Sequence, residues 1–254
     1  MSFKASFPAA FALAVYLLAL PVIEAAAQSE DSPAGPSEPS SIYDRPYSLW
    51  ENQIDEQALK RKTALMFGVG IGAMGILYVT PSVSGWEDDA TKNPFRKWWR
   101  NVSQAPVWDE DDWWLNYITH PYCGGIYYMG ARSAGAGAGQ AFVYSFVIST
   151  FFWEYGLESF AERPSIQDLI VTPVTGAIVG EGFYLAKRSI VENDYRLLNS
   201  RFLGKTAAWL MDPISELTDL IFDDEEDHNF SVQSCPIISA NGNVGGYLSL
   251  QINF

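Results

Sequence analysis

The residues best suited to chemistry lie between Trp113 and Glu181, where costly polar side chains interrupt aromatic and apolar segments. Because an unpaired buried charge is strongly destabilising, these side chains must either pair with one another or form a site. They are Asn116, His120, Tyr127, Tyr128, Arg132, Glu154, Glu158, Asp168 and Glu181. The question that the sequence poses is whether this set is a sealed internal network or an open binding or catalytic site.

One hypothesis is acid–base catalysis by His120, one of only two histidines in the chain. Histidine exchanges protons near neutral pH, and a carboxylate from Glu154, Glu158 or Glu181 would orient its ring. A nucleophile would then come from one of the serines Ser133, Ser145 and Ser149. No G-x-S-x-G motif is present. The catalytic alternative is a lipid-directed hydrolase or transferase that uses His120 with Glu154 or Glu158, and the structural alternative is a histidine that locks a loop to a helix.

Metal binding is a weaker hypothesis for the same residues. Glu154 and Glu158 are four residues apart, so a helix would place both carboxylates on one face, where His120 could join them. The Glu-x-x-His repeats of di-iron bundles are absent. The sequence therefore predicts no metal and no cofactor.

Arg132 favours the interpretation as an internal network. Its planar guanidinium can bind Glu154 or Glu158 through two parallel hydrogen bonds from a neighbouring helix. Together with His120, Tyr127 and Tyr128 this pairing would fix how the helices pack. The functional alternative is that Arg132 binds a lipid phosphate or another anion.

The elements that position these side chains are predicted to be helices. Helical segments are expected at 49–79, 141–160 and 172–188, with a short helix capped by Ser165 and an amphipathic region at 189–222. The small-residue segment 126–140 predicts a closely packed helix, with a flexible loop or a silk-like strand as the alternative. Small residues recur four apart at Gly68 and Gly72 and again at Gly176 and Gly180, which permits close helix contact. The predicted fold is mainly α, a Gly/Ala-rich bundle of four to six helices with a short C-terminal β-hairpin.

The remainder of the chain predicts its organisation and its location. Residues 1–27 have the charge, apolar run and small-residue end of a secretory signal peptide, and residues 28–48 are composed like a disordered linker. The helical domain follows at 49–222. Its charge-free segment 64–79 is just short of a typical membrane span, which favours a buried central helix. Export to the periplasm or outer membrane is the expectation.

Charge and aromatic content limit the partners. The net charge is -14, and no broad basic face is evident, so nucleic acid is not an expected partner. The segment 93–102 interleaves aromatic and basic residues. It predicts either an amphipathic helix at a lipid interface or an ordinary surface helix.

The C-terminal residues 223–254 predict an acidic loop and a β-hairpin with its turn near Asn241-Gly242-Asn243. The last strand alternates apolar and polar residues, like the final strand of an outer-membrane β-barrel, but a single hairpin cannot close a barrel. Homo-oligomers formed through this hairpin are therefore an alternative. Cys123 and Cys235 either pair or remain two thiols.

A longer string of residues carries a family resemblance. It consists of Trp114, Asn116, His120-Pro121-Tyr122, Gly124, Tyr127-Tyr128, Ala131-Arg132, Ser145, Ser149, Trp153-Glu154-Tyr155, Glu158, Glu162, Pro164-Ser165, Asp168-Leu169, Thr172-Pro173, Gly176 and Gly180-Glu181. Over roughly residues 49–195 the chain resembles the bacterial domain-of-unknown-function family 3943. The resemblance implies an exported envelope protein of Gram-negative bacteria, and the family assigns no activity. We therefore expect a membrane-associated protein with a structural or lipid-contacting role, whose partner is a membrane lipid or an outer-membrane component.

Overall fold

A computed structural model describes residues 42–51, 54–79, 93–108, 112–222, 230–238 and 244–252. The predicted signal peptide, most of the predicted linker, the acidic run at 223–227 and the hairpin turn at 241–243 lie outside these ranges. The chain divides into two compact units, Met1–Thr218 and Asp219–Phe254.

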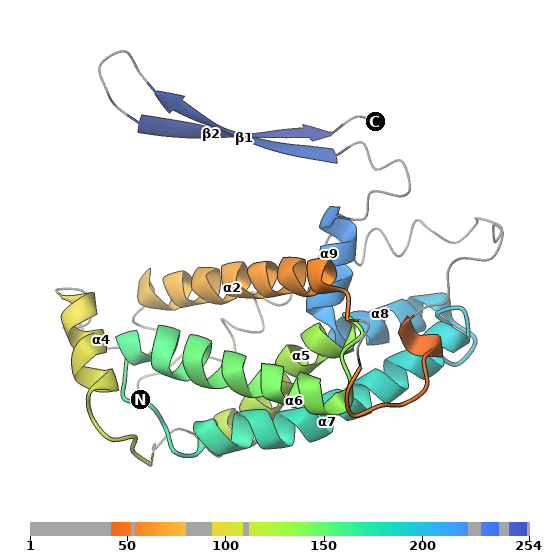
Figure 1. The fold of residues 1–254 in the computed structure, drawn as a ribbon, viewed down its shortest axis with the longest axis horizontal. Helices are drawn as coiled ribbons and strands as arrows, with labels where there is room; N and C mark the ends of the chain where they lie inside the picture. Colours follow the sequence, from red (N-terminus) through yellow and green to blue (C-terminus); the bar gives the residue numbers. More distant parts are fainter. Residues whose placement is uncertain are drawn as a thin grey trace, which may run out of the picture. The chain divides into compact units, whose positions relative to one another are not determined.

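The described part of the chain contains seven α-helices (Figure 1). They are α2 (Glu56–Val79), α4 (Pro94–Val102), α5 (His120–Arg132), α6 (Ala138–Val147), α7 (Asp168–Glu192), α8 (Arg201–Met211) and α9 (Pro213–Phe222). Shorter turns are the 3₁₀ segments η1 (Ile42–Asp44) and η5 (Glu158–Phe160) and the π-helical segments η3 (Leu115–Thr119) and η4 (Ile148–Leu157). The mainly helical prediction is confirmed. The helices outnumber the predicted four to six, partly because Pro213 separates α8 from α9.

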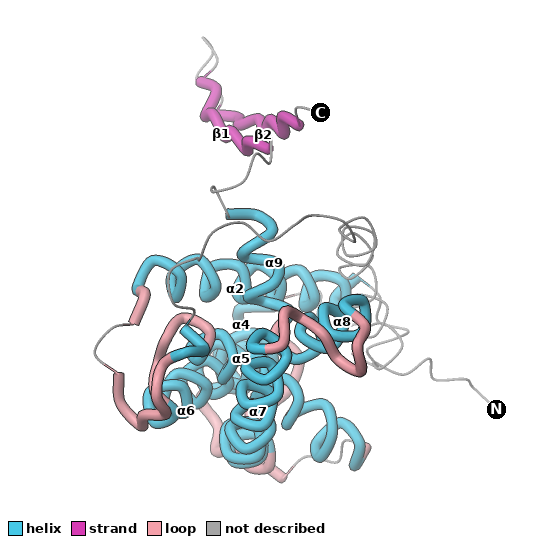
Figure 2. The backbone as a smooth tube through the Cα atoms, turned by 90° about the vertical axis from the view of Figure 1, so that its right-hand side faces the viewer, coloured by secondary structure: helices cyan, strands magenta, loops and turns pink. Residues whose placement is uncertain are grey.

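Helix α5 is the centre of the helical unit, and Figure 2 shows it beside α6 and α7. The contact with α7 is very close: a Cβ on Gly124 would lie 2.0 Å from the carbonyl oxygen of Thr172, and one on Gly176 would lie 2.5 Å from the Cα of Gly124. Gly180 packs in the same way on the ring of Tyr128. The predicted packing through Gly176 and Gly180 is therefore correct, since any larger residue would push the two helices apart.

The expected role of Gly68 and Gly72 is wrong within the described residues. No other atom would lie within 4 Å of a Cβ placed on either glycine or on Gly75, so this face of α2 is open. The helix packs instead through its other face, where Met66 joins an apolar cluster and Phe67 stacks on Phe152 at 4.0 Å between ring centroids. Spacing alone identifies a small-residue face but not the partner that covers it.

Two predicted helix boundaries are also wrong. The helix expected over 126–140 ends at Arg132, and the Gly/Ala run becomes a turn with Gly135 at φ 88°. A Cβ on Gly137 would lie 2.5 Å from the backbone of Leu49, so the glycine there allows two chain segments to touch. The break expected at Thr172-Pro173 does not occur, because α7 starts earlier, at Asp168, and passes through Pro173. The hydroxyl of Ser165 accepts a hydrogen bond from the backbone N–H of Asp168 at 3.2 Å, as the capping pattern predicted, but the helix that follows is α7 itself and not a separate short helix.

Four helical segments run back and forth between two ends of this unit. At the Arg132 end, α2 begins, α5 ends, α6 begins and α7 approaches its end. Two backbone hydrogen bonds join the segments there: the N–H of Asp55 donates to the carbonyl of Ala134 at 2.9 Å, and the N–H of Gly139 donates to the carbonyl of Leu49 at 2.9 Å. At the Glu158 end, α5 begins, η4 ends and α7 begins. This alternation determines which polar side chains can meet.

Ordered structure starts before the predicted domain boundary at residue 49. Tyr43, in η1, is buried against Met129 and Tyr184. Its ring centroid is 5.6 Å from that of Tyr184. The segment 28–48, which its composition predicts to be a disordered linker, thus contains near its end a tyrosine, Tyr43, that packs into the core.

The second unit contains β1 (Phe230–Ile238) and β2 (Val244–Ile252), which pair antiparallel. The register runs from Phe230 opposite Ile252 to Ile238 opposite Val244. Within the described residues these two strands form a sheet of their own.

Candidate functional site

The predicted set of polar residues separates into clusters at the two ends of the helical unit. At the Glu158 end, Glu154, Glu158 and Asp168 gather from η4, η5 and α7. Glu154 accepts a short hydrogen bond from the backbone N–H of Ser165. Its side chain is also hydrogen-bonded to that of Glu158. These contacts form a buried acidic cluster.

The acidic cluster favours a proton on Glu158. Burial raises the pKa of the Glu158 carboxyl well above its ordinary range, and the negative charges of Glu154, Glu162 and Asp168 raise it further. A protonated carboxyl can donate a hydrogen bond to its neighbour, so Glu154 and Glu158 can share one proton. The shared proton removes one negative charge from the acidic cluster and so reduces the repulsion between its carboxylates.

His120 joins this cluster through α7. Its Nδ1 lies 3.5 Å from Oδ1 of Asp168 and 3.1 Å from Oγ1 of Thr172. The sequence placed Asp168 in the set but did not pair it with the histidine, and Glu181, one of the predicted partners, lies at the other end of the unit. Asn116 is buried one turn before His120, in η3. The ring of His120 therefore links the start of α5 to the start of α7.

Tyr127 belongs to the apolar core that adjoins this cluster. It packs with Met66, Ile148 and Ile214, and Cys123 lies against the same group as a free thiol. Cys235 lies in β1 of the second unit.

Arg132 and Glu181 form the main contact at the opposite end. Nε and Nη2 of Arg132 donate to the two carboxylate oxygens of Glu181 at 3.0 and 3.1 Å. Tyr128 donates to the same carboxylate at 2.5 Å, and the guanidinium lies 3.6 Å from the ring centroid of Tyr184. The predicted pairing of Arg132 with Glu154 or Glu158 is wrong, because those glutamates lie at the other end of the helices. The guanidinium fork that was considered for a lipid phosphate binds Glu181.

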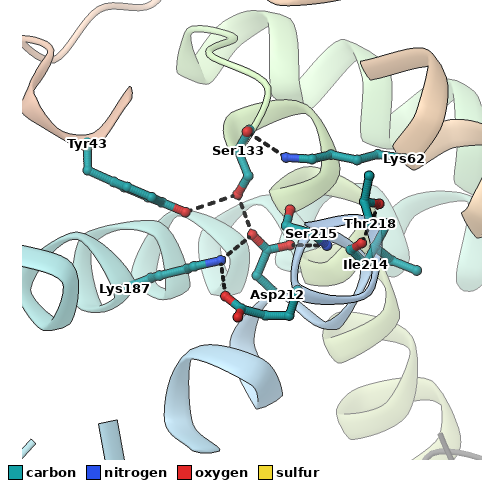
Figure 3. A network of polar contacts seen from close by, with 9 residues as sticks. Tyr43, Lys62, Ser133, Lys187, Asp212, Ile214, Ser215 and Thr218 are labelled. Atoms are coloured by element: carbon teal, nitrogen blue, oxygen red, sulfur yellow. Dashed lines mark hydrogen bonds and ion pairs between the residues drawn. The ribbon is translucent and has the colours of Figure 1, made fainter. Parts of the chain in front are cut away.

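A second charged cluster at the Arg132 end was missed by sequence reasoning (Figure 3). Asp212, between α8 and α9, is fully buried and accepts hydrogen bonds from Nζ of Lys187 at 3.0 Å and from Oγ of Ser133. Lys187 also pairs with Glu216 at 2.7 Å, and Nζ of Lys62 donates to the carbonyl of Ser133 at 2.6 Å. These residues come from α2, the α5–α6 turn, α7 and α9, so the cluster ties most of the unit together.

The charges within this cluster balance. Burial alone would raise the pKa of Asp212, but the ammonium groups of Lys187 and Lys62 and the hydrogen bonds from Ser133 and Lys187 hold it below its ordinary value. Asp212 is thus an anion between two buried cations. A signal in the sequence could have found it: Asp212-Pro213 is a helix-start pattern, and Oδ1 of Asp212 accepts from the N–H of Ser215 at 3.4 Å.

The serines that were considered as nucleophiles are occupied by structural contacts. Ser145 donates to the carbonyl of Gly124 at 3.0 Å, Ser149 donates to that of Phe146 at 3.3 Å, and Ser133 donates to Asp212. In the ranges that the structure describes, no group of three His, Cys, Asp or Glu side chains is arranged to hold a metal ion. The three serines thus tie neighbouring segments of the unit together.

The outer surface between the two ends is apolar. On α7 the exposed large side chains are Ile170, Val174, Ile178 and Leu185, and on α6 and η4 they are Phe142, Val143, Phe146, Val147 and Phe151. No charged residue occurs in 133–153 or 169–180. By length and composition α7 is able to cross a membrane, and 28% of its most apolar window is buried. The exposed residues of the helix, among them Ile170, Val174 and Ile178, face whatever surrounds the helices.

Fold and site together define a helical domain with ion pairs at one end, an acidic cluster at the other, and uncharged segments between them. Residues 105–214 match the model of a family described as domain of unknown function (DUF3943). This match confirms the family resemblance, although it starts later than the expected residue 49 and extends past 195, through α8 to the start of α9. Neither a curated protein nor a solved structure matches the chain.

Proposed function

We propose that this protein is an exported envelope protein whose helical unit is embedded in a lipid membrane, where it has a structural, lipid-contacting role. One observation carries the proposal: α7 and the continuous α6–η4 segment expose large apolar side chains over a surface that lacks charge. Contiguous exposed apolar surface on a folded domain indicates contact with a membrane or a partner.

The length of the apolar surface suits lipid. The exposed apolar side chains of α7 extend from Ile170 to Leu185, about 22 Å along the helix axis at about 1.5 Å per residue, and the one carboxylate in this stretch, Glu181, is paired with Arg132. The hydrocarbon core of a bilayer is about 30 Å thick, and the charged clusters lie beyond the uncharged segments. Ion pairs that are fully satisfied within the protein are also the form in which charges are tolerated at membrane depth.

Exposed aromatic residues near both ends support the same orientation. Tyr47 and Trp50 lie at the Arg132 end, while Trp99, Trp108 and Trp113 lie at the Glu158 end. Tryptophan and tyrosine concentrate where hydrocarbon meets headgroups, since their rings are apolar and their N–H or O–H groups are polar. Two such groups, one at each end of an apolar surface, are the pattern of a membrane-embedded helical unit.

Export to the envelope is supported by the signal-like composition of residues 1–27. The enzymatic alternative gains no comparable support, because Ser145 and Ser149 bond backbone carbonyls and Ser133 bonds Asp212. The hairpin-mediated assembly likewise rests on its strand pattern alone.

The test is Ile178→Lys, at a position that is 71% exposed on the apolar face of α7. A lysine near the centre of a spanning helix costs roughly 2.5–3.5 kcal/mol, whereas a charge on a water-exposed helix changes stability by at most about 0.5 kcal/mol. Leu198→Lys, at an 84% exposed position that follows α7, is the matched control.

The measurement is the fraction of full-length protein that resists alkaline extraction from membranes, together with its folding in lipid vesicles. We expect the wild type and Leu198→Lys to remain in the membrane and Ile178→Lys to be depleted from it or to fold poorly in vesicles. Wild-type protein that is extracted at high pH, or an Ile178→Lys variant that behaves like Leu198→Lys, would refute the proposal.

A further inference from the structure

Helix α4 is attached to the rest of the unit by side chains that complete the end of another helix. Nε1 of Trp98 donates to the carbonyls of Tyr155 and Gly156 at 2.9 and 3.0 Å, and Nδ2 of Asn101 donates to that of Ser159 at 3.0 Å. Carbonyls in the last turn of a helix have no partner further along that helix. Because α4 supplies these donors, its orientation on η4 and η5 is fixed.

The exposed face of α4 is both aromatic and basic, and the ring of Phe95 at its border packs edge-on against that of Phe160 in η5, at 5.7 Å between centroids. Phe95 and Trp99 are four residues apart and are 76% and 67% exposed. Arg96 and Arg100 have the same spacing and occupy the adjacent sector of the helix, and both are exposed. Neither arginine forms an ion pair with a residue of the described ranges. The helix therefore holds two exposed rings beside two cations.

The position of α4 decides which partner suits this face. The helix is attached to the end of η4 and to η5, and η4 also exposes Phe151, so α4 lies at the Glu158 end of the apolar surface. A helix at this level of a bilayer lies at the boundary between acyl chains and headgroups. If the rings of Phe95 and Trp99 enter the boundary between acyl chains and headgroups, Arg96 and Arg100 lie at the depth of the lipid phosphates. Guanidinium groups bind phosphates well.

We propose that α4 is an interfacial arm that selects anionic lipids, with Phe95 and Trp99 inserted at the acyl boundary and Arg96 and Arg100 bound to headgroup phosphates. This inference rests on the proposed membrane function. It adds a lipid preference and assigns that preference to two residues outside the segment that matches the family model.

The experiment measures binding of the full chain to vesicles of phosphatidylcholine alone and to vesicles with added phosphatidylglycerol. The test variant is Arg96→Gln/Arg100→Gln. The matched control is Lys60→Gln/Arg196→Gln, which removes the same two charges from exposed positions outside α4. Each cation near an anionic surface strengthens binding severalfold, so the test variant should lose roughly 20- to 30-fold in affinity for the anionic vesicles.

We expect the test variant to bind phosphatidylcholine vesicles as the wild type does and the control to retain the preference for anionic vesicles. Equal wild-type affinity for both vesicles, or an equal loss in test and control variants, would overturn the role of α4 while leaving the membrane function intact. Failure of the wild type to bind phosphatidylcholine vesicles would instead count against the membrane function.

Discussion

Replacing Asp212 with asparagine tests whether the cluster around it holds the helical unit together. The substitution keeps the shape of the side chain and one oxygen that accepts from Ser133, but it removes the negative charge. Lys187, which is 2% exposed, would then rely on Glu216, and Lys62 would lose the nearby anion that offsets its charge.

The expected loss of stability is large. Removing one partner of a buried ion pair costs about 3–5 kcal/mol, because the remaining charge is left uncompensated. Glu216, with 23% of its side chain exposed, still pairs with Lys187, so we expect a loss near the lower limit of about 3 kcal/mol. The control is Glu56→Gln, which breaks the exposed pair with Lys60 and should cost less than about 0.5 kcal/mol.

The assay is urea unfolding of the full chain in a mild detergent, followed by tryptophan fluorescence, for the wild type and both variants. A pH series adds a second readout. Because the folded pKa of Asp212 lies below its ordinary value, its contribution is present above about pH 4 and is lost as the pH falls through the folded pKa. If Asp212→Asn unfolds at the same urea concentration as Glu56→Gln, the cluster does not stabilise the fold as argued.

Two further predictions concern the helix contact and the acidic cluster. Gly124→Ala should destabilise the unit by several kcal/mol, because the added Cβ would meet the carbonyl of Thr172. Gly68→Ala, on the open face of α2, should instead stabilise the unit by about 0.5–1 kcal/mol. The free energies of unfolding of the two variants test this difference, and equal effects would refute the close packing of α5 on α7. Because the pKa of Glu158 is raised in the folded protein, its contribution to folding stability is full below about pH 4 and is lost as the pH rises towards that raised pKa. Glu158→Gln should therefore be more stable than the wild type at pH 7 and similar to it at pH 4. A Glu158→Gln variant that is less stable at pH 7 would show that the carboxylate is needed there.

Several features of the fold could be read from local sequence rules. Ser165 is followed three residues later by Asp168, which is a helix-start pattern, and the structure confirms the cap. Gly176 and Gly180 predicted a close helix contact, and α5 provides it. Rules of this kind succeed where a single helix determines the outcome.

The partners of the charged residues could not be predicted in the same way. Arg132 binds Glu181 because α5 and α7 run in the same direction past a contact at Gly124 and Gly176, and that register is a property of the assembled helices. Spacing along one helical segment correctly placed Glu154 near Glu158. It could not show that Asp168, at the start of α7, would reach His120, at the start of α5. Lys187 was missed for a related reason: in the sequence it is one of several basic residues between 187 and 205, and only the fold buries it.

The separation of the charges into two ends follows from the helices themselves. Each of the segments 121–131, 133–153 and 169–180 is free of charge and is bounded by charged or titratable residues. Side-by-side packing, with α5 and α7 parallel and α6–η4 running against them, brings those residues together at the two ends. A water-soluble domain needs apolar residues only on its inner faces, yet here the outer faces of α7 and α6–η4 are apolar as well. A helix that is apolar all round is suited to a protein interior or a membrane, and within the described residues nothing covers these faces as an interior would. The same sequence pattern therefore accounts for both the polar clusters at the two ends and the apolar outer surface on which the proposed membrane role rests.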